Sequence, residues 1–187
     1  MKFVFTILFL LLLLSSKTQD KKLTQNVFTA TILAPGISYE TPIANKFTAK
    51  FKAVISGGMS YSSGMAVGTA YSLSAIPTAS VELRYYYNFQ QRINTKKNTD
   101  RNSANYIALA GKYGISYTTF HYDDGSTARS TSYYPNAGIV WGFQRNYKNR
   151  LSLDFNIGPS LSSPLLYQEF DFIGNFTLGI WLGKKTE

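Results

Sequence analysis

The chain contains no cysteine, and charged residues make up only 16% of its 187 residues. The absence of cysteine excludes disulfide bonds, cysteine-based metal sites, a cysteine nucleophile and a lipid-modified N-terminal cysteine. Ordinary soluble domains carry about 25% charged residues. Aromatic residues reach 16%, with 14 Tyr and 13 Phe, while the mean hydropathy stays close to zero. This combination favours a protein with one apolar and one polar face and does not fit a helical membrane bundle.

The chain also lacks an apolar run long enough for a membrane-spanning helix, which needs about 20 residues. Its N-terminal run, Phe3–Leu14, follows a single basic residue and is followed by small and polar residues. This pattern predicts a secretory signal peptide over residues 1–19, cleaved between residues 16 and 19. Residues 20–187 would then form one domain. A retained N-terminal anchor helix is the alternative.

The formal net charge is +9. Removing the signal peptide with Lys2 and Lys17 leaves 17 basic and 10 acidic residues, a charge of +7. Export argues against a nucleic-acid partner, so the expected anionic partners are lipid phosphates and anionic surface polysaccharide.

Apolar residues recur with a period of two, which is typical of two-faced β-strands. In the segment from Lys46 to Ser56, for example, Phe47, Phe51 and Ile55 alternate with polar residues. These runs reach the roughly 9–11 residues that a tilted strand needs to cross a bilayer. The other segments with this pattern are Ala79–Gln90, Tyr106–Tyr117, Tyr133–Gln144, Arg150–Ser162 and Glu169–Gly183.

The alternation changes parity at Pro35-Gly36, which predicts a turn between two short strands and about eight strands in all. Short and long connectors alternate, as periplasmic turns and extracellular loops do in small membrane barrels. The predicted short turns are Pro42–Asn45, Asn94–Asn102 and Asn146–Asn149, and the predicted long loops are Gly57–Ile76, Thr118–Ser130 and Gly158–Gln168.

The predicted fold class is therefore all-β, a single antiparallel up-and-down transmembrane β-barrel. Alternation alone also fits a soluble lipocalin-like barrel or β-sandwich with its apolar face inward. The polar set is rich in Gly, Ser, Asn and Thr rather than in charges, and aromatic residues gather at strand ends, as in interfacial girdles. Both features favour the membrane barrel over the soluble binding protein.

The chain resembles the small outer-membrane β-barrel proteins of the OmpA/OmpX type, in particular the compact forms of Bacteroidetes. The resemblance is carried by Pro35–Glu40, Glu82–Asn88, Asn102–Tyr106 and the final strand Phe176–Gly183. It implies an outer-membrane location, outer-membrane lipid and lipopolysaccharide as partners, assembly by the barrel-assembly machinery and a monomeric barrel. The final strand departs from the family pattern because the chain continues to Glu187 instead of ending on an aromatic residue. The resemblance implies a fold and no particular activity.

Charged residues on the polar faces would project into a narrow lumen, where unpaired charges are unfavourable. We therefore predict a plugged, porin-like barrel whose interior charges pair with one another. A proton or ion pathway is the alternative. The predicted lumen residues are Lys50, Lys52, Glu82, Arg84, Lys112, Asp154 and Asp171.

Catalytic motifs are weak. The single histidine, His121, precedes Asp123 and Ser126 in a predicted external loop, which is compatible with a rim acyltransferase or lipase-like enzyme. Asp123-Asp124-Gly125 lacks calcium-loop spacing, and Gly57–Gly64 lacks the Lys of a phosphate-binding loop. The basic turn Asn94–Arg101 is predicted to be a solvated hairpin tip, with contact to anionic lipid as the alternative. We predict no catalytic residue, cofactor or metal, and a structural, envelope-integrity or surface-interaction role.

Overall fold

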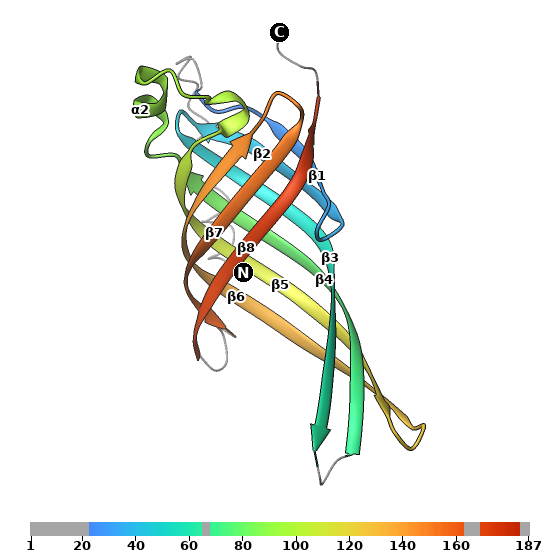
Figure 1. Ribbon diagram of the computed structural model, residues 1–187. Helices are drawn as coiled ribbons and strands as arrows, with labels where there is room; N and C mark the ends of the chain where they lie inside the picture. Colours follow the sequence, from blue (N-terminus) through green and yellow to red (C-terminus); the bar gives the residue numbers. More distant parts are fainter. Residues whose placement is uncertain (1–22, 65–67, 163–168, 184–187) are drawn as a thin grey trace, which may run out of the picture.

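The computed structural model describes residues 23–64, 68–162 and 169–183 (Figure 1). Eight antiparallel strands follow one another around a closed barrel, in which each strand pairs with its neighbours in sequence and β8 pairs with β1. The predicted all-β, up-and-down architecture with eight strands is thus confirmed, while the predicted signal peptide lies outside the described residues. The strands are β1 (Val27–Thr31), β2 (Gly36–Ala44), β3 (Phe47–Gly64), β4 (Gly68–Tyr85), β5 (Asn105–Tyr122), β6 (Thr127–Asn146), β7 (Leu151–Ser162) and β8 (Glu169–Leu182).

The predicted break at Pro35-Gly36 separates β1 from β2. The Thr31 hydroxyl donates a hydrogen bond to the Ala34 carbonyl at 2.5 Å, which closes the turn. A Cβ atom at Gly36 would lie 2.2 Å from the Ala53 carbonyl oxygen on β3. A side chain at this position would therefore push β2 away from β3, and glycine allows the close approach.

Strands β3 to β6 continue well past the rest of the barrel, and the two hairpins that they form extend beyond it in Figure 1. The long loops predicted over Gly57–Ile76 and Thr118–Ser130 are wrong for most of their length, because these residues lie mainly in strands β3 to β6. In the predicted loop Gly158–Gln168, residues 158–162 belong to β7 and residues 163–168 lie outside the described residues. The β3–β4 ladder runs without interruption to the pair Gly64 and Gly68. The backbone N–H and C=O groups of this hairpin pair with one another, and this pairing does not depend on the side chains. A composition rich in Gly and Ser therefore does not prevent strand formation.

The opposite end of the barrel carries β1's start, β8's end and the connection from β4 to β5. Strand β4 ends at Tyr85, so the predicted strand Ala79–Gln90 was too long. The chain instead folds into α2 (Phe89–Asn94) and a short 3-10 helix (Asp100–Asn102). We call residues 86–104 the closing segment, because Phe89 is buried with a 1% exposed fraction and Asn102, Ser103 and Ala104 are fully buried.

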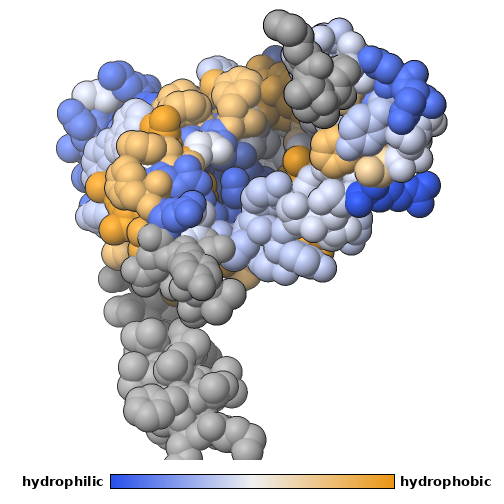
Figure 2. Space-filling view, turned by 90° about the horizontal axis from the view of Figure 1, so that it is seen from below, coloured by the Kyte–Doolittle hydropathy of each residue, from blue (hydrophilic) through white to orange (hydrophobic). Residues whose placement is uncertain are grey.

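The barrel has its apolar side chains outside and its polar side chains inside. Among the residues whose side chains are described, 20 buried residues are polar or charged and 12 are hydrophobic, which reverses the order of a soluble protein's core. Phe51, Leu109, Ile139 and Phe176 on the outer wall are 50–60% exposed. Seen from the end with the extended hairpins, hydrophilic residues gather around the opening and hydrophobic residues lie on the flanks (Figure 2). In the described part of the chain, no helix has the length and apolarity to cross a membrane.

Candidate functional site: the closed lumen

Three charged residues lie in one row across adjacent strands. Strand register places Glu40 of β2 opposite Lys50 of β3, and Lys50 opposite Glu82 of β4. All three are buried, with exposed fractions of 1%, 6% and 6%. Opposite charges on directly facing positions attract one another, so the row alternates in sign across the inner wall.

Arg84 joins this row to the far side of the barrel. Its guanidinium lies 2.6 Å from a Glu82 carboxylate oxygen and 2.7 Å from Asp154 of β7, and 3.8 Å from Glu40. It also donates a hydrogen bond to the Gln144 side chain at 2.8 Å and lies 4.0 Å above the centre of the Tyr106 ring. The side chain is completely buried, so this cation is held entirely by protein groups.

Neighbouring polar side chains donate hydrogen bonds to the carboxylates that Arg84 contacts. Lys50 Nζ donates to Asp154 at 2.6 Å, and the Tyr106 hydroxyl donates to the other Asp154 oxygen at 2.6 Å. Asn156 donates to Glu82 at 3.3 Å and to Tyr106 at 3.1 Å. A Cβ atom on Gly142 would lie 2.7 Å from the Tyr106 ring, so the absence of a side chain there makes room for the tyrosine.

Glu40 belongs to the same group of buried charged residues, although it was not among the predicted lumen residues. Its carboxylate accepts hydrogen bonds from Thr48 and Tyr86 at 2.7 Å each, and from Gln144 at 3.0 Å. The sequence alternation could have predicted this position. Ile37 and Tyr39 are the apolar residues of the strand, so Glu40 falls on the opposite, polar face. We call Glu40, Lys50, Glu82, Arg84 and Asp154 the lumen network; its formal charges sum to −1.

The closing segment covers the lumen at the end opposite the extended hairpins. Arg101 stacks over the Trp181 ring at 3.5 Å, and Trp181 itself is 1% exposed on the inner face of β8. Asn102 exchanges two hydrogen bonds with the backbone of Gln25, at 2.7 and 2.9 Å. The Asn146 side chain donates to the Arg101 carbonyl at 2.5 Å. The lumen is therefore closed by protein at this end, and the predicted solvated tip is in part a folded cap.

The other predicted lumen residues lie nearer the extended hairpins. Lys52 hydrogen-bonds to Asn175, and Asn136 donates to the exposed Asp171 at 3.3 Å. Lys112 lines two cavities of about 240 and 380 Å³ that share Ser56, Thr78 and Lys112 in their walls. Of the seven predicted residues, the structure brings four into the lumen network and leaves Lys52, Lys112 and Asp171 outside it, in or beside this open half.

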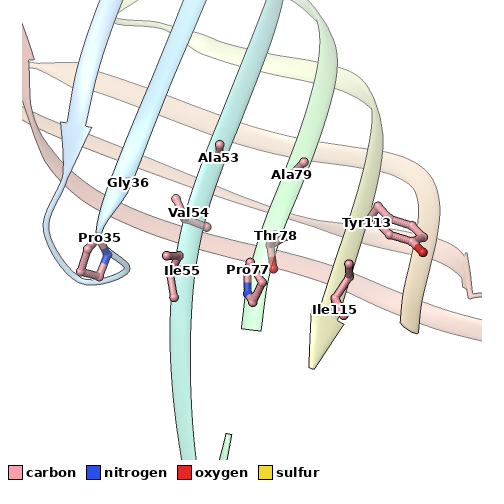
Figure 3. A pocket seen from close by; sticks show the side chains of 10 residues that line it. All are labelled: Pro35, Gly36, Ala53, Val54, Ile55, Pro77, Thr78, Ala79, Tyr113 and Ile115. Carbon is pink, nitrogen blue, oxygen red and sulfur yellow. The ribbon is translucent and has the colours of Figure 1, made fainter. Parts of the chain in front are cut away.

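A further hollow lies on the outer wall. It has a volume of about 440 Å³ and an apolar lining, and Figure 3 shows its side chains on neighbouring strands. Small residues, Ala53 and Ala79, pair across β3 and β4 and leave space between the larger Ile55 and Tyr113. The hollow carries no charged group and belongs to the apolar outer surface.

The candidate catalytic residues do not form a triad. His121 lies in strand β5 rather than in a loop, opposite Thr127, and its ring stacks on Tyr71 with centroids 4.7 Å apart. Asp123 accepts a hydrogen bond from the Thr69 backbone at 2.6 Å. Within the described ranges, His121 has no hydrogen bond to Asp123 or to Ser126.

The neighbouring acidic group also has a local role. The Asp124 carboxylate accepts a hydrogen bond from the Ser126 backbone at 2.8 Å, and its interactions with Ser126 lower the pKa of this exposed carboxyl. Asp124 thereby shapes the tight turn between β5 and β6. Across the described residues, no group of three or more His, Cys, Asp or Glu side chains could hold a metal ion.

Comparison with known proteins adds no functional assignment. No protein-family model matches the chain, and no curated protein or solved structure matches it either.

Proposed function

We propose that this protein is an integral outer-membrane barrel of the OmpA/OmpX type with a plugged lumen and a non-enzymatic role in the envelope. Its partners would be membrane lipid, lipopolysaccharide and, during biogenesis, the barrel-assembly machinery. Strands β3 to β6 would present their extended hairpins at the cell surface, and the barrel wall would anchor them.

The observation that carries this proposal is the reversed distribution of polarity. Large apolar side chains point outward around the wall, including Phe51, Leu83, Leu109 and Ile139. Soluble monomers rarely expose contiguous apolar patches beyond a few hundred Å². A closed barrel leaves no unpaired strand edge within the wall, which is the condition for strands to lie in lipid. A soluble lipocalin-like barrel needs the opposite arrangement, with its apolar residues inside.

The lumen network supports a plug rather than a pathway. An eight-stranded barrel has an interior just wide enough for its own side chains. Here buried ion pairs fill one half of the lumen, and the closing segment covers the adjacent end. A porin-like water channel would need this half to be open.

The test compares two arginine substitutions on the outer face of the chain. Leu109→Arg places a charge in the wall and should prevent assembly in lipid vesicles, because such a charge costs about 2–4 kcal/mol near the bilayer midplane. Thr131→Arg, on the same outward parity in the extended part of β6, should assemble normally. Heat-modifiable gel mobility reports the folded barrel.

A wild-type chain that folds in buffer without detergent or lipid would overturn the proposal. Equal assembly of Leu109→Arg and Thr131→Arg in vesicles would also overturn it. Fractionation of the native protein gives a second measurement, since the proposal requires it in the outer-membrane fraction.

A further inference from the structure

The formal charges of the described residues are distributed unevenly along the barrel axis. The inner face of the barrel has no net charge, because four basic residues balance four acidic ones. The basic residues are Lys50, Lys52, Arg84 and Lys112, and the acidic ones are Glu40, Glu82, Asp154 and Asp171. The end with the extended hairpins carries Arg129 against Asp123, Asp124 and Glu169. The opposite end carries eight basic residues and one acidic residue, a charge of +7. We call this set the basic end: Lys46, Arg92, Lys96, Lys97, Arg101, Arg145, Lys148 and Arg150, with Asp100.

Part of the basic end forms a groove. The closing segment and the turn between β6 and β7 border an open groove of about 670 Å³, which is lined by Lys96, Lys97, Asp100 and Lys148 among other polar residues. The three lysines are exposed, and Asp100 leaves the lining with a charge of +2. Three ammonium groups around one open groove attract an anion with several oxygens, such as a phosphate.

The walls of this groove are held in place. The Asn98 side chain donates a hydrogen bond to the Asn146 carbonyl at 2.8 Å, which ties the closing segment to the end of β6. Arg92 donates to the Asn98 carbonyl through two nitrogens, at 3.1 and 2.8 Å. The lysines therefore project from a fixed backbone, which lowers the entropy lost on binding.

Backbone conformation points to the same place. Within the described ranges, every non-glycine residue with positive φ lies at this end: Lys96 (52°), Arg101 (50°), Asn102 (63°) and Arg150 (73°). The left-handed region is unfavourable for L-residues with long side chains, and glycine or asparagine is its usual occupant. Arg101 has a structural reason to be basic, since it stacks on Trp181. Lys96 makes no side-chain hydrogen bond or ion pair in the described part of the chain, so its ammonium is available to a ligand.

The surroundings indicate where the anion comes from. An aromatic rim precedes the basic end along the wall: Phe47 stacks on Tyr85 at 4.8 Å, and Trp141 donates a hydrogen bond to the Tyr87 hydroxyl at 2.8 Å. Aromatic rings of this kind lie at the headgroup level of a bilayer. Basic residues just beyond such a rim lie at the depth of the lipid phosphates.

We propose that the basic groove binds the phosphate headgroups of anionic phospholipid in the leaflet next to this end. The inference rests on the proposed membrane function. It assigns Lys96, Lys97 and Lys148 to headgroup binding and makes the barrel's stability depend on the lipid charge. The opposite end, with a charge of −2, has no such preference.

The experiment measures urea unfolding of the full chain in vesicles of phosphatidylcholine, with and without 30% phosphatidylglycerol. Lipid that binds the folded barrel raises its stability. Each lysine near an anionic surface contributes about a fivefold change in the equilibrium constant. Phosphatidylglycerol changes the unfolding equilibrium constant of the wild type by a certain factor. In the double variant Lys96→Gln/Lys97→Gln this factor should be about 30 times smaller. Arg129→Gln, at the opposite end, should retain the wild-type effect.

The outcomes separate the two proposals. A chain that does not fold into either vesicle overturns the membrane function itself. A chain that folds into both with equal stability, or a double variant that keeps the full effect, overturns the headgroup site alone. Stabilisation in phosphatidylcholine vesicles by inorganic phosphate, lost in the double variant and matching the phosphatidylglycerol effect, would assign the groove to a soluble anion and overturn the lipid proposal.

Discussion

Replacing Arg84 with Met tests whether the lumen network holds the barrel together. The substitution keeps an unbranched side chain of similar length and removes the cation that contacts Glu82, Asp154 and Glu40. Lys50 would then be the remaining cation of the lumen network, against its three buried carboxylates. Breaking a buried ion pair by removing one partner destabilises a protein by about 3–5 kcal/mol. We expect a loss in this range, because Arg84 is completely buried and its removal takes the cation away from the carboxylates that it contacts.

The measurement is the free energy of unfolding in phosphatidylcholine vesicles, followed by tryptophan fluorescence and by heat-modifiable gel mobility. Arg129→Met is the matched control, since Arg129 is exposed on the extended part of β6 and surface changes stay within about 0.5 kcal/mol. A second substitution, Arg84→Met/Glu82→Gln, removes one of the carboxylates left without a partner. Its stability should therefore lie above that of Arg84→Met alone.

Two results would refute this reasoning. A loss below about 1 kcal/mol for Arg84→Met would mean that water or lipid headgroups reach the carboxylates, so that the lumen is open. A double variant less stable than Arg84→Met would mean that Glu82 stabilises the barrel by contacts other than its pair with Arg84.

Two further predictions concern transport and catalysis. In planar bilayers the wild-type chain should carry no steady current, because the lumen network and the Arg101–Trp181 stack fill the path; a stable conductance in the purified protein would contradict the plug. His121→Ala should fold like the wild type, and neither protein should hydrolyse lipid or peptide in detergent. Turnover by the wild type that falls 10²–10⁴-fold in His121→Ala would indicate general-base catalysis and contradict the non-enzymatic role.

Much of the barrel could be predicted from residue order alone. A period of two with apolar residues on one parity requires two-faced strands, and the parity change at Pro35-Gly36 requires a turn. The same pattern places Lys50, Arg84 and Asp154 on the inner face, because consecutive strand residues point to opposite sides. These conclusions need no knowledge of which strands are neighbours.

The closing segment was not predictable in the same way. Its helix α2 spans six residues, which is too short to show a helical period, and Phe89 stands where the strand alternation would also place an apolar residue. The extended hairpins were missed for a related reason. Their Ser- and Gly-rich composition is typical of loops, while the ladder between β3 and β4 depends on backbone groups that sequence patterns do not report.

Residue order determined that this chain has one apolar face, one polar face and charges on the polar one. Tertiary structure alone decided which charges meet. Glu40 and Asp154 are 114 positions apart, yet both contact Arg84, because barrel closure and register bring β2, β4 and β7 around one point of the lumen. Pairing across a barrel depends on the distance between facing walls. A charge that is buried without a partner is strongly unfavourable. The strand register that pairs all five residues of the lumen network is therefore the stable one.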